Sequence, residues 1–216
     1  MMRGMRGNMS RQDNEPVEQK LTKRQIQKAA TRKNILAKTR DLFIKEGLSG
    51  IKASAIAKQA GIGEGTIFAH FGDINALLSE VNQIETEVYL NKARKSIDEN
   101  NSVEDNLLSY TFIIMSYYVE SSGTLLRHTI FTLSRDHNNL EKLVIRSIKD
   151  YIDILRLGVA SGELKADTDI KAYGDICYSV AISNIIAGLR FDKFDFEQRY
   201  KNVKHNLMVL LEGLRR

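Results

Sequence analysis

Residues that interrupt helices are scarce in this chain of 216 residues. It contains a single proline, Pro16, close to its start. Proline removes a backbone donor and kinks helices, so its absence after position 16 leaves room for long uninterrupted helices. The sequence therefore predicts an all-α fold.

Cysteine and long apolar runs are equally scarce. Cys177 is the one cysteine, so the chain cannot form an internal disulfide and fits a reducing cytosol. The longest apolar stretch, residues 176–189, is too short for a membrane span. No apolar run follows Arg3 and Arg6, as a secretory signal would require. We therefore expect a cytoplasmic protein that has no membrane partner.

Charge is present but unevenly distributed. Residues 1–80 hold 14 Lys and Arg against 8 Asp and Glu, whereas residues 81–216 hold 18 against 19. Residues 20–58 contain 11 basic residues and only two acidic ones, Asp41 and Glu46. A polyanion is the natural partner of such a segment. A solvated basic helix face is the alternative, and it is less common over three consecutive elements.

Cap and breaker residues divide the chain into about nine helices. Thr22, followed by Gln25, has the form of a capping box, and Gly47 ends the helix that begins there. Asp73, Ser102 and Asp169 have the positions of further N-caps. The expected helices cover residues 22–46, 53–60, 66–71, 73–98, 102–120, 125–133, 138–160, 170–189 and 197–214. Residues 1–19 are expected to form a disordered tail.

The stretch from Ala53 to Phe71 has the spacing of a helix-turn-helix. Two short helices joined at a steep angle need a small residue where they approach, a glycine with positive φ in the turn, and an apolar residue beneath the second helix. Ala57, Gly61 and Ile67 meet these requirements. Further core-facing side chains are expected at Ile56, Ala60, Ile62, Phe68 and Phe71. An ordinary hairpin within a helical bundle is the alternative, because this spacing is short.

The residues around this motif resemble the DNA-binding domain of the TetR/AcrR family of regulators. The resemblance covers residues 32–78 and is carried by Ile35-Leu36, Leu42-Phe43, Gly47, Ile56-Ala57-Lys58-Gln59-Ala60 and the run from Gly61 to Phe71. It implies a helix-turn-helix at 52–71 within a DNA-binding domain of residues 20–78. It also implies a larger helical domain, residues 79–216, that binds a small-molecule inducer and forms a homodimer. The implied function is a transcriptional regulator, and repression is the family expectation.

The implied DNA contacts lie on the first helix and on the helix-turn-helix. The candidates are Lys28, Arg32, Lys33, Lys52, Ser54, Gly63, Glu64, Gly65, Thr66, Phe68 and His70. The cations would neutralise phosphates, and Gly63 and Gly65 would let backbone amides approach the DNA closely. Glu64 would be repelled by phosphate unless it accepts from a cytosine amino group. The alternatives are a capping or packing role for His70 and a plain N-cap for Ser54.

Three positions depart from the family pattern. Position 63 is Gly where Ser or Thr is usual, position 68 is Phe in place of Tyr, and position 74 is Ile where Lys is common. Each change removes one expected contact to the DNA backbone.

Residues 81–216 carry no catalytic motif, such as a Gly-rich phosphate loop or a nucleophile elbow, so we expect neither an enzyme nor a cofactor. A ligand pocket is implied instead by the resemblance and by residue type. Its candidate lining residues are Phe112, Met115, Tyr118, Arg127, His128, Phe131 and Tyr178. For any one of them, a plain core position is the alternative.

The last two helices carry more apolar surface than one helix face needs. The positions are Ile176, Val180, Ile182, Ile185, Ile186, Leu189, Val203, Leu207, Leu210, Leu211 and Leu214. They resemble the dimerising helix pair of TetR-type proteins, which would set two recognition helices about 34–36 Å apart on a pseudo-palindromic operator. A ligand carrier without DNA binding and a small helical enzyme are the competing classes. The basic segment at residues 20–58 argues against a ligand carrier, and the lack of a set of catalytic residues argues against an enzyme.

Overall fold

The computed structural model describes residues 22–117, 137–189 and 195–215. These ranges contain eight α-helices, one short 3-10 helix and an isolated antiparallel bridge between Leu164 and Arg215. The all-α prediction is therefore confirmed. The predicted tail at 1–19 and the predicted helix at 125–133 lie outside the described residues. Within those residues, no helix combines the length and the apolar character that a membrane crossing needs.

Five elements form the N-terminal part of the fold. They are α1 (Lys23–Glu46), η1 (Leu48–Gly50), α2 (Ala53–Ala60), α3 (Glu64–Phe71) and α4 (Ile74–Arg94). The capping box at the start of α1 is confirmed, because the Gln25 amide donates to Thr22 Oγ1 at 3.3 Å and the Thr22 amide donates to Gln25 Oε1 at 2.8 Å. The Asp73 carboxylate caps α4 by accepting from the Ala76 amide at 2.8 Å.

Four further helices form the C-terminal part. They are α5 (Val103–Ser116), α7 (His137–Ser161), α8 (Ile170–Leu189) and α9 (Phe196–Leu214). Ser102 caps α5 by accepting from the Asp105 amide at 3.0 Å, and Asp169 caps α8 by accepting from the Ala172 amide at 3.1 Å. Both predicted caps are therefore confirmed.

Three predicted helix ends are wrong by a few residues, and one of them is the end of α5, which lies at Ser116 rather than at Glu120. α3 begins at Glu64 rather than at Thr66. α4 ends at Arg94 rather than near Asp98. The Ser96 hydroxyl donates to the Ala93 carbonyl at 2.7 Å, and this local bond competes with the next helical turn.

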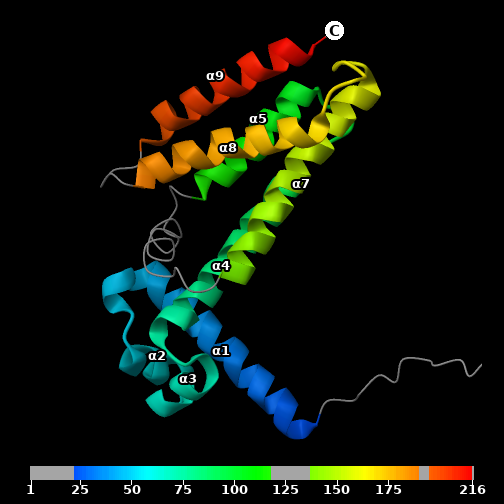
Figure 1. Ribbon diagram of the computed structural model, residues 1–216. Helices are drawn as coiled ribbons and strands as arrows, with labels where there is room; N and C mark the ends of the chain where they lie inside the picture. The colour runs from blue at the N-terminus through cyan, green and yellow to red at the C-terminus, as the bar shows by residue number, and fades with distance from the viewer. Residues whose placement is uncertain (1–21, 118–136, 190–194, 216) are drawn as a thin grey trace, which may run out of the picture.

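The buried side chains form two hydrophobic cores, one at each end of α4. The N-terminal core joins Ile35 of α1, Ile56 of α2 and Ile67 of α3 with residues of the first half of α4. The C-terminal core contains Ala93, near the end of α4, together with residues of α5, α7, α8 and α9. Figure 1 shows α1, α2 and α3 gathered at one end of the molecule, α8 and α9 at the other, and α4 running between them. Among the described residues, α4 therefore contributes to both cores.

Five of the eleven apolar residues assigned to dimerisation are internal. Of the predicted set, Ile185, Val203, Leu207, Leu211 and Leu214 are at most 5% exposed and lie in the C-terminal core. Ile176 and Ile186 of α8 are exposed, and Val180, Ile182 and Leu210 are half-buried. Leu189 is not among the residues whose side chains the structure describes. Val209 of α9, which the sequence did not single out, is 57% exposed.

Candidate nucleic-acid interface

Helices α2 and α3 meet in the turn geometry that the sequence predicted. Gly61 ends α2 with φ +68° and ψ +36°, a left-handed conformation that favours glycine. The Ile62 amide closes the turn by donating to the Ala57 carbonyl at 3.0 Å. Ala57 and Ile67 are buried where the two helices approach each other. The helix-turn-helix therefore forms from local sequence signals.

The outer surface of α3 holds most of the predicted recognition residues. Glu64, Gly65 and Phe68 are exposed, and Thr66 is half-buried. Phe68 is 44% exposed, so the prediction that it faces the core is wrong. Its side chain is accessible on the surface of α3, as a DNA contact would require. Gly63 is the N-cap of α3 and makes no side-chain cap bond, as expected from its departure from Ser or Thr. Ile74, the third departure, packs against the N-terminal core.

His70 lies at the C-terminal end of α3 and is half-buried. Its Nδ1 atom is buried and has no hydrogen-bond partner among the described residues. Its ring lies 6.2 Å from the ring of Phe71, measured between centroids. The imidazole therefore packs against the domain and caps no helix end through this nitrogen.

Three predicted phosphate-binding lysines, Lys28, Lys33 and Lys52, are exposed. None of the three forms an ion pair within the described residues, so their charge is available to a partner. Ser54 is also exposed, and the N-cap of α2 is Lys52. The N-cap interpretation of Ser54 is therefore wrong, and its hydroxyl faces solvent in the first turn of α2.

Arg32 is placed differently from these lysines. Its guanidinium forms an ion pair with Glu80 of α4 and donates to the His70 carbonyl at 2.7 Å. It also lies over the Phe71 ring, 4.1 Å from the centroid. The structure thus gives Arg32 internal partners that the sequence did not predict.

Polar side chains tie α4 to α1 and α5. Arg40 of α1 forms an ion pair with Glu85, whose side chain is only 6% exposed. The Tyr117 hydroxyl, at the end of α5, donates to Asn82 Oδ1 at 2.7 Å. Burial raises the pKa of Tyr117, which keeps this donor protonated. The middle of α4 is therefore bonded to both parts of the molecule.

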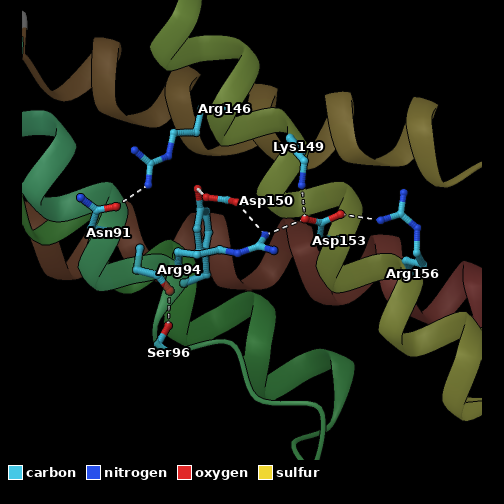
Figure 2. Close-up of polar contacts among 10 residues, drawn as sticks. Asn91, Arg94, Ser96, Arg146, Lys149, Asp150, Asp153 and Arg156 are labelled. Atoms are coloured by element: carbon cyan, nitrogen blue, oxygen red, sulfur yellow. Dashed lines mark hydrogen bonds and ion pairs between the residues drawn. The ribbon is translucent and has the colours of Figure 1, made fainter. Parts of the chain in front are cut away.

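Arg94 is one of the residues that fasten the end of α4 to α7 (Figure 2). Arg94 Nη1 donates to Asp150 Oδ1 and to Asp153 Oδ2, each at 2.7 Å. Asp150 is buried and also accepts from the Tyr110 hydroxyl at 3.2 Å. Sequence reasoning missed this cluster because Arg94 and Tyr110 lie 40 to 59 positions from the carboxylates that they contact, and no local pattern marks these pairs.

Three of the seven candidate ligand residues lie within the described residues. Met115 is fully buried in the C-terminal core, as the alternative interpretation expected. Phe112 is 44% exposed, and its ring lies against those of Phe196 and Tyr200 of α9, at 5.3 and 5.1 Å between centroids. Tyr178 is half-buried against the C-terminal core. The remaining candidates, Tyr118, Arg127, His128 and Phe131, lie outside the described residues.

Comparison with known sequences identifies the N-terminal domain. A sequence model of "Bacterial regulatory proteins, tetR family" matches residues 35–81. A curated relative, the "Fatty acid metabolism regulator protein" of Bacillus subtilis (strain 168), is 23% identical over 181 residues. The aligned region covers 81% of this chain and 90% of the relative. The match therefore extends well beyond the helix-turn-helix.

Solved structures of regulators share the whole fold. A TetR-family transcriptional regulator from Pectobacterium atrosepticum superposes with a TM-score of 0.74 at 18% identity, over 90% of this chain and 98% of the other. The regulator FadR from Bacillus subtilis, solved in complex with stearoyl-CoA, gives a TM-score of 0.61 at 18% identity, over 85% and 99% of the two chains. The sequence match therefore identifies residues 35–81 as a helix-turn-helix segment of the tetR type, and the solved structures show that the chain shares the fold of TetR-family transcriptional regulators.

Proposed function

We propose that this regulator is a repressor that binds a pseudo-palindromic operator as a homodimer and is released by a small-molecule inducer. The observation that carries the proposal is the surface of the helix-turn-helix. The exposed side of α3 is accompanied by Lys28, Lys33 and Lys52, which are exposed cations without acidic partners in the described residues. Such a surface suits a duplex, because its cations can neutralise phosphates while the recognition helix enters the major groove.

The base-reading part of the proposal rests on the small side chains at the start of α3. An added Cβ at Gly63 or Gly65 would meet no atom of the protein within 4 Å, so both positions are open to a partner. Thr66 and Phe68 would lie next to the base edges, where the Thr66 hydroxyl can hydrogen-bond to a base and the Phe68 ring can contact a thymine methyl group. Glu64 would accept from a cytosine amino group.

The dimer is proposed to form through α8 and α9. Residues 176–189 carry no charged side chain, although 27% of the whole chain is charged. On α8, Ile176, Ser179, Ser183 and Ile186 are exposed and recur at helical spacing. An exposed apolar face without charges is typical of the centre of a protein interface. Pairing of this face would place two recognition helices on one DNA molecule.

For the inducer, we propose a long-chain acyl thioester as the first chemical class to test. The support is the Bacillus subtilis regulator of the same fold, which was solved with stearoyl-CoA. Inducer binding would act through α4, because this helix is part of both cores and is bonded to α1, α5 and α7. An inducer that favours a different α4 position would weaken DNA binding by about 1 to 3 kcal/mol, a typical allosteric coupling.

Fluorescence anisotropy with duplexes selected from a random pool tests the DNA part. We expect a two-fold symmetric consensus and an affinity that falls steeply with salt. Six lysines per dimer, the three named above from each protomer, would give a slope of about −5 for log affinity against log salt concentration if each neutralises one phosphate. The double variant Lys28→Gln/Lys33→Gln should reduce that slope by about 3 to 4. The matched control is Lys95→Gln/Lys142→Gln, which removes two exposed lysines outside the helix-turn-helix and the proposed dimer helices and should leave the slope unchanged.

Stearoyl-CoA added to the protein–DNA complex tests the inducer part, with free coenzyme A as the control. Release by the thioester alone supports an acyl-CoA inducer. Release by neither compound rejects that class and leaves the DNA-binding result standing. If the anisotropy experiment instead finds only weak binding that does not depend on sequence, the result favours a ligand carrier that no longer binds an operator.

A further inference from the structure

We propose that Arg32 is a positioning residue that sets the orientation of the recognition helix α3, and that it acts from inside the protein rather than on DNA phosphate. The inference rests on the proposed function, because it concerns how the same helix-turn-helix recognises its operator. It assigns Arg32 a role different from the phosphate contact that its position in a basic helix suggests.

The contacts of Arg32 join three helices at one guanidinium. Arg32 belongs to α1, His70 and Phe71 are the last two residues of α3, and Glu80 lies in the second turn of α4. Nη1 donates to the His70 carbonyl, Nη2 pairs with the Glu80 carboxylate, and the guanidinium plane covers the Phe71 ring. We call these four residues the Arg32 clamp.

A guanidinium is suited to this position for physical reasons. Carbonyls at the C-terminal end of a helix lack intrahelical donors and carry a partial negative charge, so a cation there is favourable. Arginine can make hydrogen bonds in two directions in its plane and still stack on an aromatic ring. A lysine ammonium provides the charge but not the planar stack, so it cannot make all three contacts.

A second contact from α1 follows the same principle. Asn34, two residues after Arg32, donates from Nδ2 to the Ala60 carbonyl at 3.0 Å, at the end of α2. Side chains of α1 therefore bind the C-terminal carbonyls of both helices of the motif. These contacts fix α2 and α3 relative to α1, in addition to the packing of Ile35, Ile56 and Ile67.

The Arg32 clamp also contains an acidic residue of the connecting helix. Glu80 is followed along α4 by Asn82 and Glu85, which bond to Tyr117 and Arg40. A shift of α4 would therefore move the Glu80 carboxylate that pairs with Arg32, and so change the contact between Arg32 and the end of α3. The clamp thus provides a short physical route from the connecting helix to the recognition helix.

Charge-changing variants of opposite sign separate the clamp from a phosphate contact. Arg32→Gln removes a positive charge and Glu80→Gln removes a negative one, so simple attraction to DNA predicts weaker binding for the first and tighter binding for the second. The clamp predicts that both variants lower the affinity for the selected operator by about tenfold, with the double variant no worse than either single one. Binding to scrambled duplex and the salt slope should change little.

Two further variants complete the design. Arg32→Lys should behave like Arg32→Gln if the planar contacts matter, and like the wild type if Arg32 binds phosphate. Lys38→Gln is the control, because Lys38 lies on α1 and its ion pair among the described residues is with Asp41 of the same helix, at 3.6 Å. It should leave operator affinity unchanged.

Hydrogen exchange of the free protein gives a readout that needs no DNA. Amides of residues 64–72 should exchange faster in Arg32→Gln and in Glu80→Gln than in the wild type, while amides of α8 keep their wild-type rates. Wild-type rates in α3, rescue by Arg32→Lys, or tighter operator binding by Glu80→Gln would each overturn the proposal. A wild-type protein that binds no operator would refute the proposed function alone, since the exchange result would still decide the clamp.

Discussion

At the residue scale, Ile67 and Phe68 are neighbours in α3 with opposite surroundings. Ile67 is fully buried in the N-terminal core, whereas Phe68 is 44% exposed. Ile67→Ala should lower the free energy of unfolding by about 2 to 5 kcal/mol, since it leaves a cavity in a packed core. Phe68→Ala should change it by less than about 1 kcal/mol but weaken operator binding. Urea denaturation and anisotropy measure the two effects. Equal losses of stability would show that Phe68 is a core residue.

Asp153 gives the stability a predicted pH dependence. Burial disfavours its charged form, but hydrogen bonds from Lys149, Arg94 and Arg156 outweigh that effect and lower its pKa to about 2 (Figure 2). The unfolded chain would protonate near about 3.9. A depressed pKa stabilises the fold above the unfolded value, and this contribution disappears as the pH falls through about 4 to 2.

Asp153→Asn should therefore cost about 1 to 2 kcal/mol at pH 7, an estimate reduced for the partial exposure of its partners. The stabilities of variant and wild type, measured by urea denaturation, should converge as the pH falls below about 3. Asp167→Asn, in an exposed turn, is the control. A constant difference between Asp153→Asn and wild type at all pH values would contradict the electrostatic origin.

Sequence reasoning found the residues whose partners are local and missed those whose partners are distant. Thr22 and Ser102 act on amides three positions away, so the chain itself displays the pattern. Arg32 was recognised only as a cation, because its partners are 38 and 48 positions further along. Only the folded arrangement of α1, α3 and α4 distinguishes it from Lys33, which is exposed beside it.

At the element scale, α3 contains a glycine that its own stability does not require. Gly65 lies within the helix, its φ is not positive, and an added Cβ would meet no atom within 4 Å. Gly65→Ala should therefore stabilise the protein by about 0.5 to 1 kcal/mol through the higher helix propensity of alanine. It should also weaken operator binding if the α3 backbone approaches DNA closely. Thermal unfolding and anisotropy test both statements, and a variant with unchanged affinity would rule out the close approach.

Gly61 supplies the matched comparison for Gly65. Its φ of +68° is unfavourable for alanine, although the space around it is open. Gly61→Ala should therefore destabilise the protein by about 1 kcal/mol or more. Two glycines four residues apart are thus expected to respond to the same substitution with opposite signs.

The ends of the elements show where helix prediction from local pattern stops. α8 begins and ends as expected, because Asp169 caps it and its apolar run is continuous. α4 is shorter than its apolar pattern suggests, since Ile97 continues the periodicity while the Ser96 hydroxyl binds the Ala93 carbonyl. The Asp98 amide then donates to Asn106 Oδ1 of α5 at 3.0 Å, a tertiary contact that no helical pattern encodes.

At the scale of the whole molecule, burial decides which apolar residues remain for a partner. Sequence patterns selected Leu207 and Leu211 together with Ile186, because periodicity alone does not distinguish a core face from an interface. In the structure the two leucines are fully buried, whereas Ile186 is 39% exposed. The proposed dimer surface is therefore narrower than the sequence suggested and centred on the uncharged face of α8.

Ile186→Glu tests this surface directly. A carboxylate on the face of α8 would be buried without a partner on association, so the variant should sediment as a monomer while keeping its helical content. Loss of the second half-site contact should weaken operator binding by about 100-fold or more and halve the salt slope. Ile145→Glu is the control, because Ile145 is 58% exposed on α7 and lies outside the proposed interface. An Ile186→Glu protein that stays dimeric and binds the operator like the wild type would show that the interface does not lie on this face of α8. A monomeric protein with unchanged affinity would show that one recognition helix is enough for operator binding.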